Sequence, residues 1–159
     1  MAEAYQNGKV FAILHKGDPA RPILSGLSFA PDDDYVYVFV HGGGDVTRFE
    51  NLKSGTHEIP ADVVASLLAN HYGIALSGMA IRMCTCYGNM LRPGDTKTIV
   101  QTLAGVLPQV NFEGYHGLVV LNASPPRIRL GYSVRWDATA IPPGAVVTGP
   151  PGSWEPVVP

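Results

Sequence analysis

The chain has 159 residues, of which 46% are hydrophobic and 15% are charged, and its formal net charge at pH 7 is -2. This apolar content is enough for one hydrophobic core, and the length is too short for two ordinary domains, so we expect a single domain. The near-neutral charge and the lack of any lysine or arginine run argue against binding to a nucleic-acid backbone or an anionic membrane. The expected partners are therefore proteins, peptides or small molecules.

The sequence carries no visible export signal or membrane span. The segment MAEAYQNGKV lacks a basic stretch followed by an apolar one, and no apolar run is long enough to cross a bilayer. The only cysteines are Cys84 and Cys86, and a disulfide between residues two apart would be strained and would close almost no loop. We expect a protein that folds in the cytoplasm, or that is exported without a cleavable signal peptide.

Five runs rich in β-branched and aromatic residues have the length of β-strands. They span residues 10–14, 35–40, 79–83 and 118–121, with a weaker alternating run at 127–136.

Two segments between these runs have the spacing of amphipathic helices. In PADVVASLLANHYG, Pro60 suits a first helical turn, Gly73 provides a stop, and the apolar residues share one face with His71. In GDTKTIVQTLAGVLPQV, Asp95 or Thr96 is expected to cap a helix whose apolar residues repeat at helical spacing.

The order strand, helix, strand, helix, strand is typical of a parallel sheet, because parallel neighbours need crossover connections. The runs at 35–40 and 118–121 are apolar throughout, as expected for strands that are buried on both faces. We therefore predict a single α/β domain over residues 1–140, with a mostly parallel sheet and crossover helices. Residues 141–159 are rich in proline and glycine, and we expect this tail to be extended or disordered.

Two of the predicted strands end in residues that are suited to chemistry. Ligands of open parallel sheets bind beyond the carboxyl ends of the strands. The run at 35–40 continues into His41 and three glycines, and the run at 79–83 continues into CTCYG, which contains Cys84 and Cys86. If these strands are neighbours, a histidine and a cysteine meet at one edge of the sheet.

A histidine that accepts the proton of a nearby thiol makes a dyad able to attack an amide carbonyl and form an acyl-enzyme. The backbone N–H groups of Gly42 or Gly43 and of Cys86 would then stabilise the negative oxygen of the tetrahedral intermediate. The sequence therefore predicts His41 as the base and a cysteine as the nucleophile, with no metal or other cofactor.

The arrangement resembles the caspase-like cysteine peptidases, which include caspases, legumains, gingipains, CHAT-domain proteases and the self-processing domains of large bacterial toxins. These proteins share the order strand, His-Gly, helix, strand, and then a cysteine followed closely by glycine. Here VFVHGG, ADVVASLLAN and IRMCTCYG match these elements in turn, and the similarity covers residues 35–121. It is strongest to the toxin-type members, in which Ile-Arg, two apolar residues and Ser or Thr precede the cysteine.

The resemblance implies a caspase-like three-layer sandwich in which Cys86 is the nucleophile and His41 is the base. It further implies cleavage of a peptide bond in a protein or peptide substrate, as in a bacterial effector or a self-processing protease. Because residues two apart in a strand share a face, we expect Cys84 to lie deeper in the sheet than Cys86. The short loop after His41 and the short region after Leu121 depart from the family and indicate a reduced or degenerate member, or one with an unusual substrate.

Four further residues are candidates for lining the substrate pocket: Asp45, Cys84, Glu113 and His116. Asp45 could instead orient the histidine or cap a turn. Glu113 and His116 precede a predicted strand near the same edge, where a solvated turn is the alternative. Arg82 is unusual inside an apolar strand and indicates a buried ion pair or a position near the sheet edge.

Other classes of protein share parts of this pattern. An HGGG stretch is typical of the oxyanion loop of lipase-type hydrolases, but the Gly-x-Ser-x-Gly elbow that they need is missing. Zinc binding by Cys84, Cys86 and His71 would use the right ligand types, but CTC lacks the usual two-residue spacer. The remaining alternative is a non-catalytic α/β protein-binding module, in which the glycines form a turn and the cysteines belong to the core.

Overall fold

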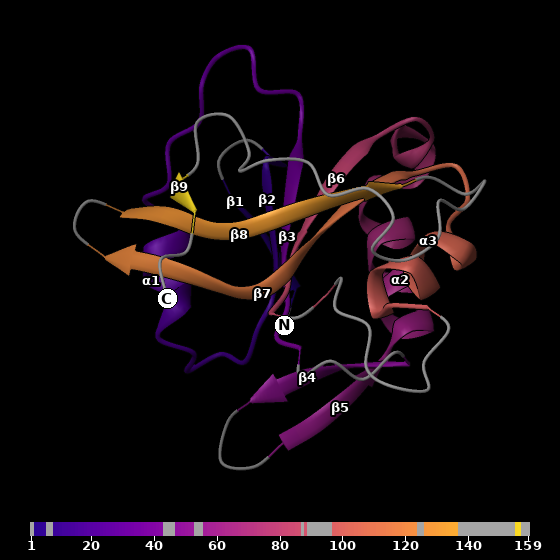
Figure 1. The fold of residues 1–159 in the computed structure, drawn as a ribbon, viewed down its shortest axis with the longest axis horizontal. Helices are drawn as coiled ribbons and strands as arrows, with labels where there is room; N and C mark the ends of the chain where they lie inside the picture. The colour runs from indigo at the N-terminus through magenta and orange to yellow at the C-terminus, as the bar shows by residue number, and fades with distance from the viewer. Residues whose placement is uncertain are drawn as a thin grey trace.

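The computed structural model describes residues 2–5, 8–42, 47–52, 56–86, 88, 97–123, 126–136 and 155–156. Within these residues, the centre is a seven-stranded sheet with the order β1-β2-β3-β6-β7-β8-β9 (Figure 1). The central strands run parallel and are β2 (Val10–Ile13), β3 (Val36–Phe39), β6 (Ala80–Cys84) and β7 (Asn111–Ala123). The chain is therefore an α/β protein with a mostly parallel central sheet, as the sequence predicts.

Antiparallel strands extend the sheet on both sides. β1 (Ala2–Tyr5) pairs with β2, and β8 (Pro126–Trp136) pairs with β7 in a long hairpin that is bulged between His116 and Val119. In the tail, β9 (Glu155–Pro156) runs parallel to β8. The other residues of 141–159 lie outside the described part of the chain.

Helices cover both faces of the sheet (Figure 1). α2 (Ala61–Tyr72), the 3-10 helix η2 (Gly73–Leu76) and α3 (Ile99–Val106) contribute to the core on one face, and α1 (Ala20–Leu24) contributes to the core on the other.

The alternation of side chains along the strands fills these two cores. Val38 of β3 belongs to the core that contains Val64 of α2 and Leu103 of α3. Its neighbour Tyr37 belongs to the opposite core, together with Leu24 of α1. Because both faces are covered, the strands need apolar residues at successive positions, which explains the continuous apolar runs in the sequence.

The helix ends and faces differ in detail from the sequence prediction. Thr98 caps α3, since its side chain accepts a hydrogen bond of 3.1 Å from the backbone N–H of Gln101. The predicted cap at Asp95 or Thr96 is therefore wrong, and these two residues lie outside the described part. In α2, Val63 and His71 are exposed rather than part of the buried stripe. The buried side chains of α2 are Ala61, Val64, Ala65 and Leu68.

A small second sheet lies between β3 and α2 in the sequence. It consists of the hairpin β4 (Arg48–Leu52) and β5 (Thr56–Pro60), which projects below the main sheet in Figure 1. Phe49 of this hairpin is fully buried in the core under α2 and α3. Ile59 of β5 is partly buried and packs against the same core, and β5 leads directly into α2.

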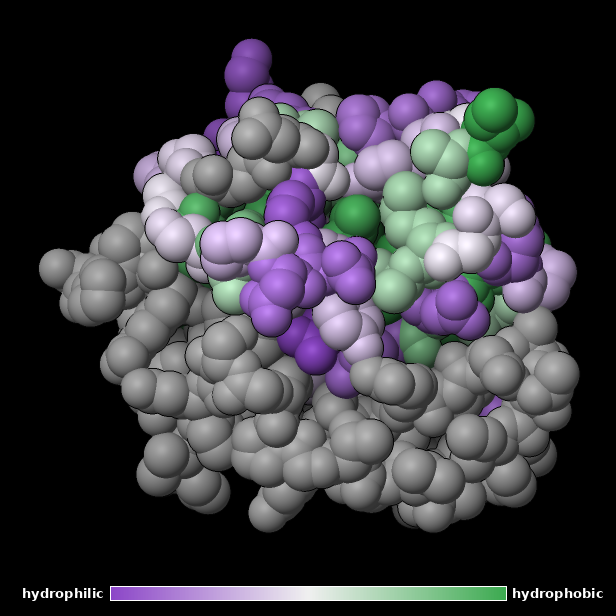
Figure 2. All heavy atoms as spheres, turned by 90° about the horizontal axis from the view of Figure 1, so that it is seen from above, coloured by the Kyte–Doolittle hydropathy of each residue, from purple (hydrophilic) through white to green (hydrophobic). Residues whose placement is uncertain are grey.

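The surface of the described residues is mixed in character. Among them, the large hydrophobic side chains that are exposed are Val63, Ile74 and Val106. The face in Figure 2 shows polar side chains near the centre and apolar ones towards the right, with polar side chains bordering them. None of the described helices is both long and apolar enough to cross a membrane.

Candidate active site

The two strands that precede His41 and Cys86 are direct neighbours. β3 and β6 pair in parallel, with Phe39 opposite Cys84. His41 and Cys86 each lie two residues beyond this pair. Because side chains alternate along an extended chain, both are placed on the face of Phe39 and Cys84. The predicted adjacency of the two strands is therefore confirmed.

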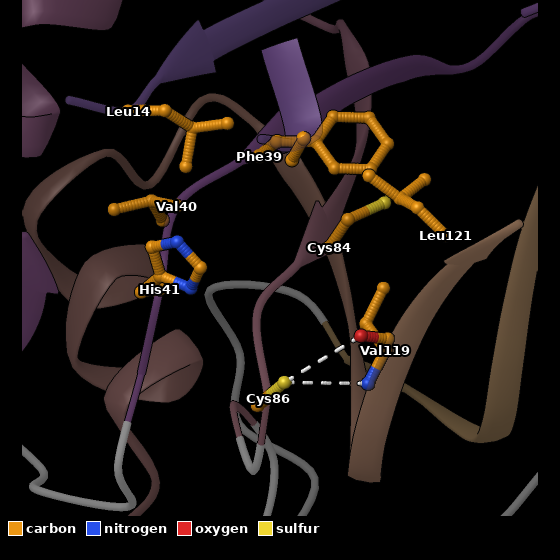
Figure 3. A pocket seen from close by; sticks show the side chains of 9 residues that line it. Leu14, Phe39, Val40, His41, Cys84, Cys86, Val119 and Leu121 are labelled. Carbon is orange, nitrogen blue, oxygen red and sulfur yellow. Dashed lines mark hydrogen bonds between the residues drawn. The ribbon is translucent and has the colours of Figure 1, made fainter. Parts of the chain in front are cut away.

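His41 and Cys86 line one small pocket at the carboxyl edge of the sheet (Figure 3). Its cavity volume is about 50 Å³, which leaves space for a few water molecules or a short aliphatic side chain. The lining consists of Leu14, Ala20, Phe39, Val40, His41, Cys84, Cys86, Val119 and Leu121. The pocket is thus apolar except for the imidazole and the thiols.

The Cys86 thiol contacts the backbone of β7. Its sulfur accepts a hydrogen bond from the N–H of Val119 at 3.4 Å and donates one to the carbonyl oxygen of Val119 at 3.6 Å. Figure 3 shows the sulfur directed towards Val119, with the His41 ring across the pocket from it.

His41 is held by two elements besides its own strand. Its Nε2 lies 2.6 Å from Oδ2 of Asp18, a residue that is 8% exposed. Its backbone carbonyl accepts a hydrogen bond of 2.8 Å from the N–H of Glu50 in β4. The hairpin and the segment after β2 therefore fix the backbone and the ring of His41, respectively.

Asp18 was not predicted from the sequence. It follows β2 in the segment LHKGDP, at the same carboxyl edge of the sheet as His41 and Cys86. The rule that ligands bind beyond the carboxyl ends of parallel strands applies to the first predicted strand as well. Applied to all strands, it would have selected this carboxylate.

The glycine after His41 is required by close packing. A Cβ atom at Gly42 would lie 2.4 Å from Cγ2 of Thr85 and 2.8 Å from the carbonyl oxygen of Cys86. The histidine loop thus packs directly on the segment that carries the nucleophile candidate. The role of Gly42 in an oxyanion hole stays a prediction, and Gly43 lies outside the described residues.

A tight turn carries Cys86. The N–H of Gly88 donates a hydrogen bond of 3.1 Å to the carbonyl oxygen of Thr85 and closes the turn. The carbonyl oxygen of Gly88 accepts a hydrogen bond of 3.1 Å from the N–H of Val100, in the first turn of α3. Because the first N–H groups of a helix lack partners within the helix, this bond anchors the cysteine turn to α3.

The two cysteines lie in different environments. Cys84 is 4% exposed, and burial raises the pKa of its thiol well above the usual range. Cys86 is only partly buried. The prediction that Cys84 lies deeper than Cys86 is confirmed, and its raised pKa makes Cys84 the poorer nucleophile.

Glu113 does not line the pocket. It is 2% exposed and pairs with Arg82, whose Nε lies 3.3 Å from Oε2 of Glu113. The expectation that Glu113 reaches the pocket is therefore wrong, because its carboxylate neutralises a cation inside the sheet. The predicted ion pair of Arg82 is confirmed.

The Arg82 guanidinium has further partners in the same core. It donates a hydrogen bond of 3.0 Å to the hydroxyl of Tyr37, and its centre lies 3.8 Å from the ring centre of Tyr35. Burial alone would lower the pKa of Arg82, but Tyr115, Glu113 and Tyr37 raise it. Arg82 therefore stays charged inside the sheet.

The remaining candidates are only partly placed. Asp45 lies outside the described residues. His116 lies in β7 opposite Tyr132, and its side chain is likewise outside the described part. His71, the third ligand of the zinc alternative, is exposed on α2, and its ring lies tilted against that of Phe11 with 4.8 Å between ring centres. The described residues hold no group of three or more potential metal ligands.

Together, the fold and these side chains define an α/β protein with an apolar pocket at the carboxyl edge of a parallel sheet and a thiol and an imidazole in its lining. Comparisons with family models, with curated proteins and with solved structures gave no match for the chain.

Proposed function

We propose that this chain is a cysteine peptidase with a caspase-like arrangement, in which Cys86 is the nucleophile and His41 is the general base. One observation carries the proposal: the two residues follow neighbouring parallel strands at matching positions and line the same pocket. A thiol and an imidazole at one pocket are the minimum that acyl transfer to a cysteine requires.

The chemistry follows the usual steps of acyl transfer. His41 accepts the thiol proton, and the Cys86 sulfur attacks the carbonyl carbon of the peptide bond. The C–N bond then breaks, and the amine leaves with the proton held by His41. Water next attacks the thioester with His41 again as the base, which releases the carboxylic acid and restores the thiol.

The contacts of Cys86 with Val119 belong to the resting state in this proposal. The N–H of Val119 stabilises a thiolate, whereas its carbonyl oxygen stabilises the neutral thiol. A substrate that enters the pocket would displace the sulfur from Val119. Hydrogen bonds in catalytic sites commonly tighten only when substrate is bound, so the resting geometry is compatible with this step.

The pocket favours an aliphatic substrate side chain. Leu14, Phe39, Val119 and Leu121 contribute apolar walls. Arg82 lies on the same face of β6 as Cys84, but it is paired with Glu113 and is not free to bind an acidic side chain. We expect cleavage next to a short aliphatic residue, either in this chain or in a partner protein.

A fluorogenic peptide library tests the proposal. We expect turnover of peptides with Ala, Val or Leu at the cleavage site and none in Cys86→Ala. Peptides with Asp or Lys at this position should be cleaved poorly. Cleavage that persists in Cys86→Ala would contradict the assignment of the nucleophile.

The orientation of the thiol towards Val119 favours a second candidate function, the non-catalytic α/β binding module. A thiol whose hydrogen bonds are satisfied by a strand needs no reactivity. Labelling with iodoacetamide separates the two functions. A catalytic Cys86 reacts faster than an ordinary thiol near neutral pH and slows in His41→Ala, whereas a structural Cys86 does not respond to this substitution.

A further inference from the structure

The segment between β2 and α1 holds Asp18 in a fixed place. The N–H of Asp18 donates a hydrogen bond of 2.9 Å to the carbonyl oxygen of His15 and closes a turn. The following residue, Pro19, restricts the backbone of Asp18. This turn brings the chain back over the end of the sheet, where Asp18 meets His41.

The two oxygens of the Asp18 carboxylate have different partners. Oδ1 accepts a hydrogen bond of 2.9 Å from the N–H of Ala20 at the start of α1, which fixes the side-chain rotamer. Oδ2 lies 2.6 Å from Nε2 of His41. If Asp18 only capped α1, the contact of Oδ1 with Ala20 would be sufficient. The contact of Oδ2 with His41 therefore indicates an additional role. It directs a buried carboxylate at the imidazole.

This contact determines which nitrogen of His41 carries the proton. An ionised carboxylate only accepts hydrogen bonds, so Nε2 must donate and therefore carries a hydrogen. In neutral His41 the lone pair is then on Nδ1, which is the nitrogen left for a substrate or a thiol.

We propose that Asp18 is a positioning residue that fixes the Nε2–H tautomer of His41, so that Nδ1 is the nitrogen that exchanges a proton with Cys86. The proton exchange rests on the proposed function, whereas the tautomer does not. In this arrangement only His41 and Cys86 take part in the bond changes, and Asp18 acts through His41. The carboxylate also stabilises the imidazolium that forms when the thiol loses its proton.

The tautomer is measurable without any activity. Protein labelled with 15N-histidine reports the protonation of each ring nitrogen, and a His41→Gln variant identifies the signals of His41. We expect a proton on Nε2 in the wild-type protein at a pH where the ring is neutral. A proton on Nδ1 would overturn the proposal directly, whether or not any variant folds.

The decisive variant is Asp18→Asn, whose amide can donate a hydrogen bond to Nε2 and so favours the Nδ1–H tautomer. We expect the 15N signals to report this exchange. In a Cys84→Ala background, iodoacetamide labelling of Cys86 should slow. Peptide cleavage should fall on the order of 10²–10⁴-fold, as for loss of a general base.

A matched control is Asp33→Asn. Asp33 is also a largely buried aspartate with several partners, among them the hydroxyl of Tyr37 at 2.5 Å and Lys9 at 3.4 Å, but it does not line the pocket. This variant should lose stability without changing the His41 tautomer or the labelling rate.

Three further outcomes are decisive. Equal labelling rates in Asp18→Asn and Asp33→Asn would overturn the proposal, as would an unchanged tautomer in Asp18→Asn. If the tautomer and the labelling rate respond to Asp18→Asn but the wild-type protein cleaves no peptide, the positioning role of Asp18 stands and the peptidase function fails.

Discussion

The contact between the histidine loop and the cysteine turn can be tested with Gly42→Ala. The new Cβ would lie 2.4 Å from Cγ2 of Thr85 and 2.8 Å from the carbonyl oxygen of Cys86. Ordinary carbon contacts are about 3.5–4.0 Å, so the overlap with Thr85 exceeds about 1 Å. Thr85 is fully buried, and the carbonyl oxygen of Cys86 belongs to the backbone, so this oxygen can move only if the turn shifts.

We expect Gly42→Ala to lower the free energy of unfolding by about 1–3 kcal/mol, the usual range for overpacking. For a chain of this size, this corresponds to a fall in Tm of roughly 2–4 °C for each kcal/mol. Any relief of the overlap displaces Cys86 relative to His41. A misplacement of about 1 Å can cost on the order of 10²-fold in rate, so peptide cleavage should fall by more than the loss of stability explains.

Gly105→Ala is the matched control. Gly105 lies in α3, and a Cβ there would meet nothing within 4 Å. This variant should be more stable than the wild type by about 0.5–1 kcal/mol, because alanine is the better helix former. The free energy of unfolding in urea and the rate of peptide cleavage should be compared between both variants and the wild type. A Gly42→Ala protein with the stability and the activity of the wild type would refute the inferred packing of the two loops.

Three further predictions concern residues elsewhere in the sheet and in α2. Cys84→Ala should lower the free energy of unfolding on the order of 1 kcal/mol through a small cavity and keep activity. Cys86→Ala should keep its Tm and lose activity. A stable but inactive Cys84→Ala protein would assign the nucleophile to Cys84 instead of Cys86. Glu113→Ala should cost about 3–5 kcal/mol in urea unfolding, because it leaves the Arg82 charge uncompensated, and a loss below about 1 kcal/mol would contradict the ion pair. Burial raises the pKa of Tyr72 from 10.0 to about 12, because the folded protein favours the neutral phenol. The stabilisation that the neutral Tyr72 side chain provides is therefore complete below pH 10 and is lost as the pH rises towards 12. Tyr72→Phe should therefore lose less stability than the wild type between pH 9 and pH 12, and equal losses would show that other groups cause the alkaline effect.

The elements that could be predicted well from the sequence are those in which successive residues are buried on both faces of the sheet. The parallel strands are covered by helices on both faces, so nearly every residue is apolar and the pattern is strong. The hairpin β4–β5 was missed because RFENLKSGTHEIP is mostly polar. Among its described side chains, Phe49 is fully buried and Ile59 packs partly buried against the same core, and so few apolar contacts leave no periodicity in the sequence.

β7 was predicted too short for a different reason. The sequence NFEGYHGLVV contains Gly114 and Gly117, which normally weaken or interrupt a strand. In the structure the strand continues through both glycines, and its register with β8 shifts between His116 and Val119. A bulge absorbs the irregularity by placing an extra residue in one strand, and the pairing partner that makes this possible is distant in sequence. Local strand propensity therefore placed the start of this strand at residue 118 instead of Asn111.

The difference between the predicted and the missed parts of the site follows from the register of the sheet. Ala12, Phe39 and Cys84 lie opposite one another on β2, β3 and β6. His41 and Cys86 are two residues beyond this row, about 6.6 Å along an extended chain, so the strands alone bring them to the same level.

Asp18 is six residues beyond Ala12, and an extended chain would carry it about 20 Å away. It reaches His41 only because the turn closed by His15 folds the chain back. Residues that continue a strand can therefore be placed from sequence, whereas a residue that depends on a turn can be placed only when the hydrogen bonds of the turn are known.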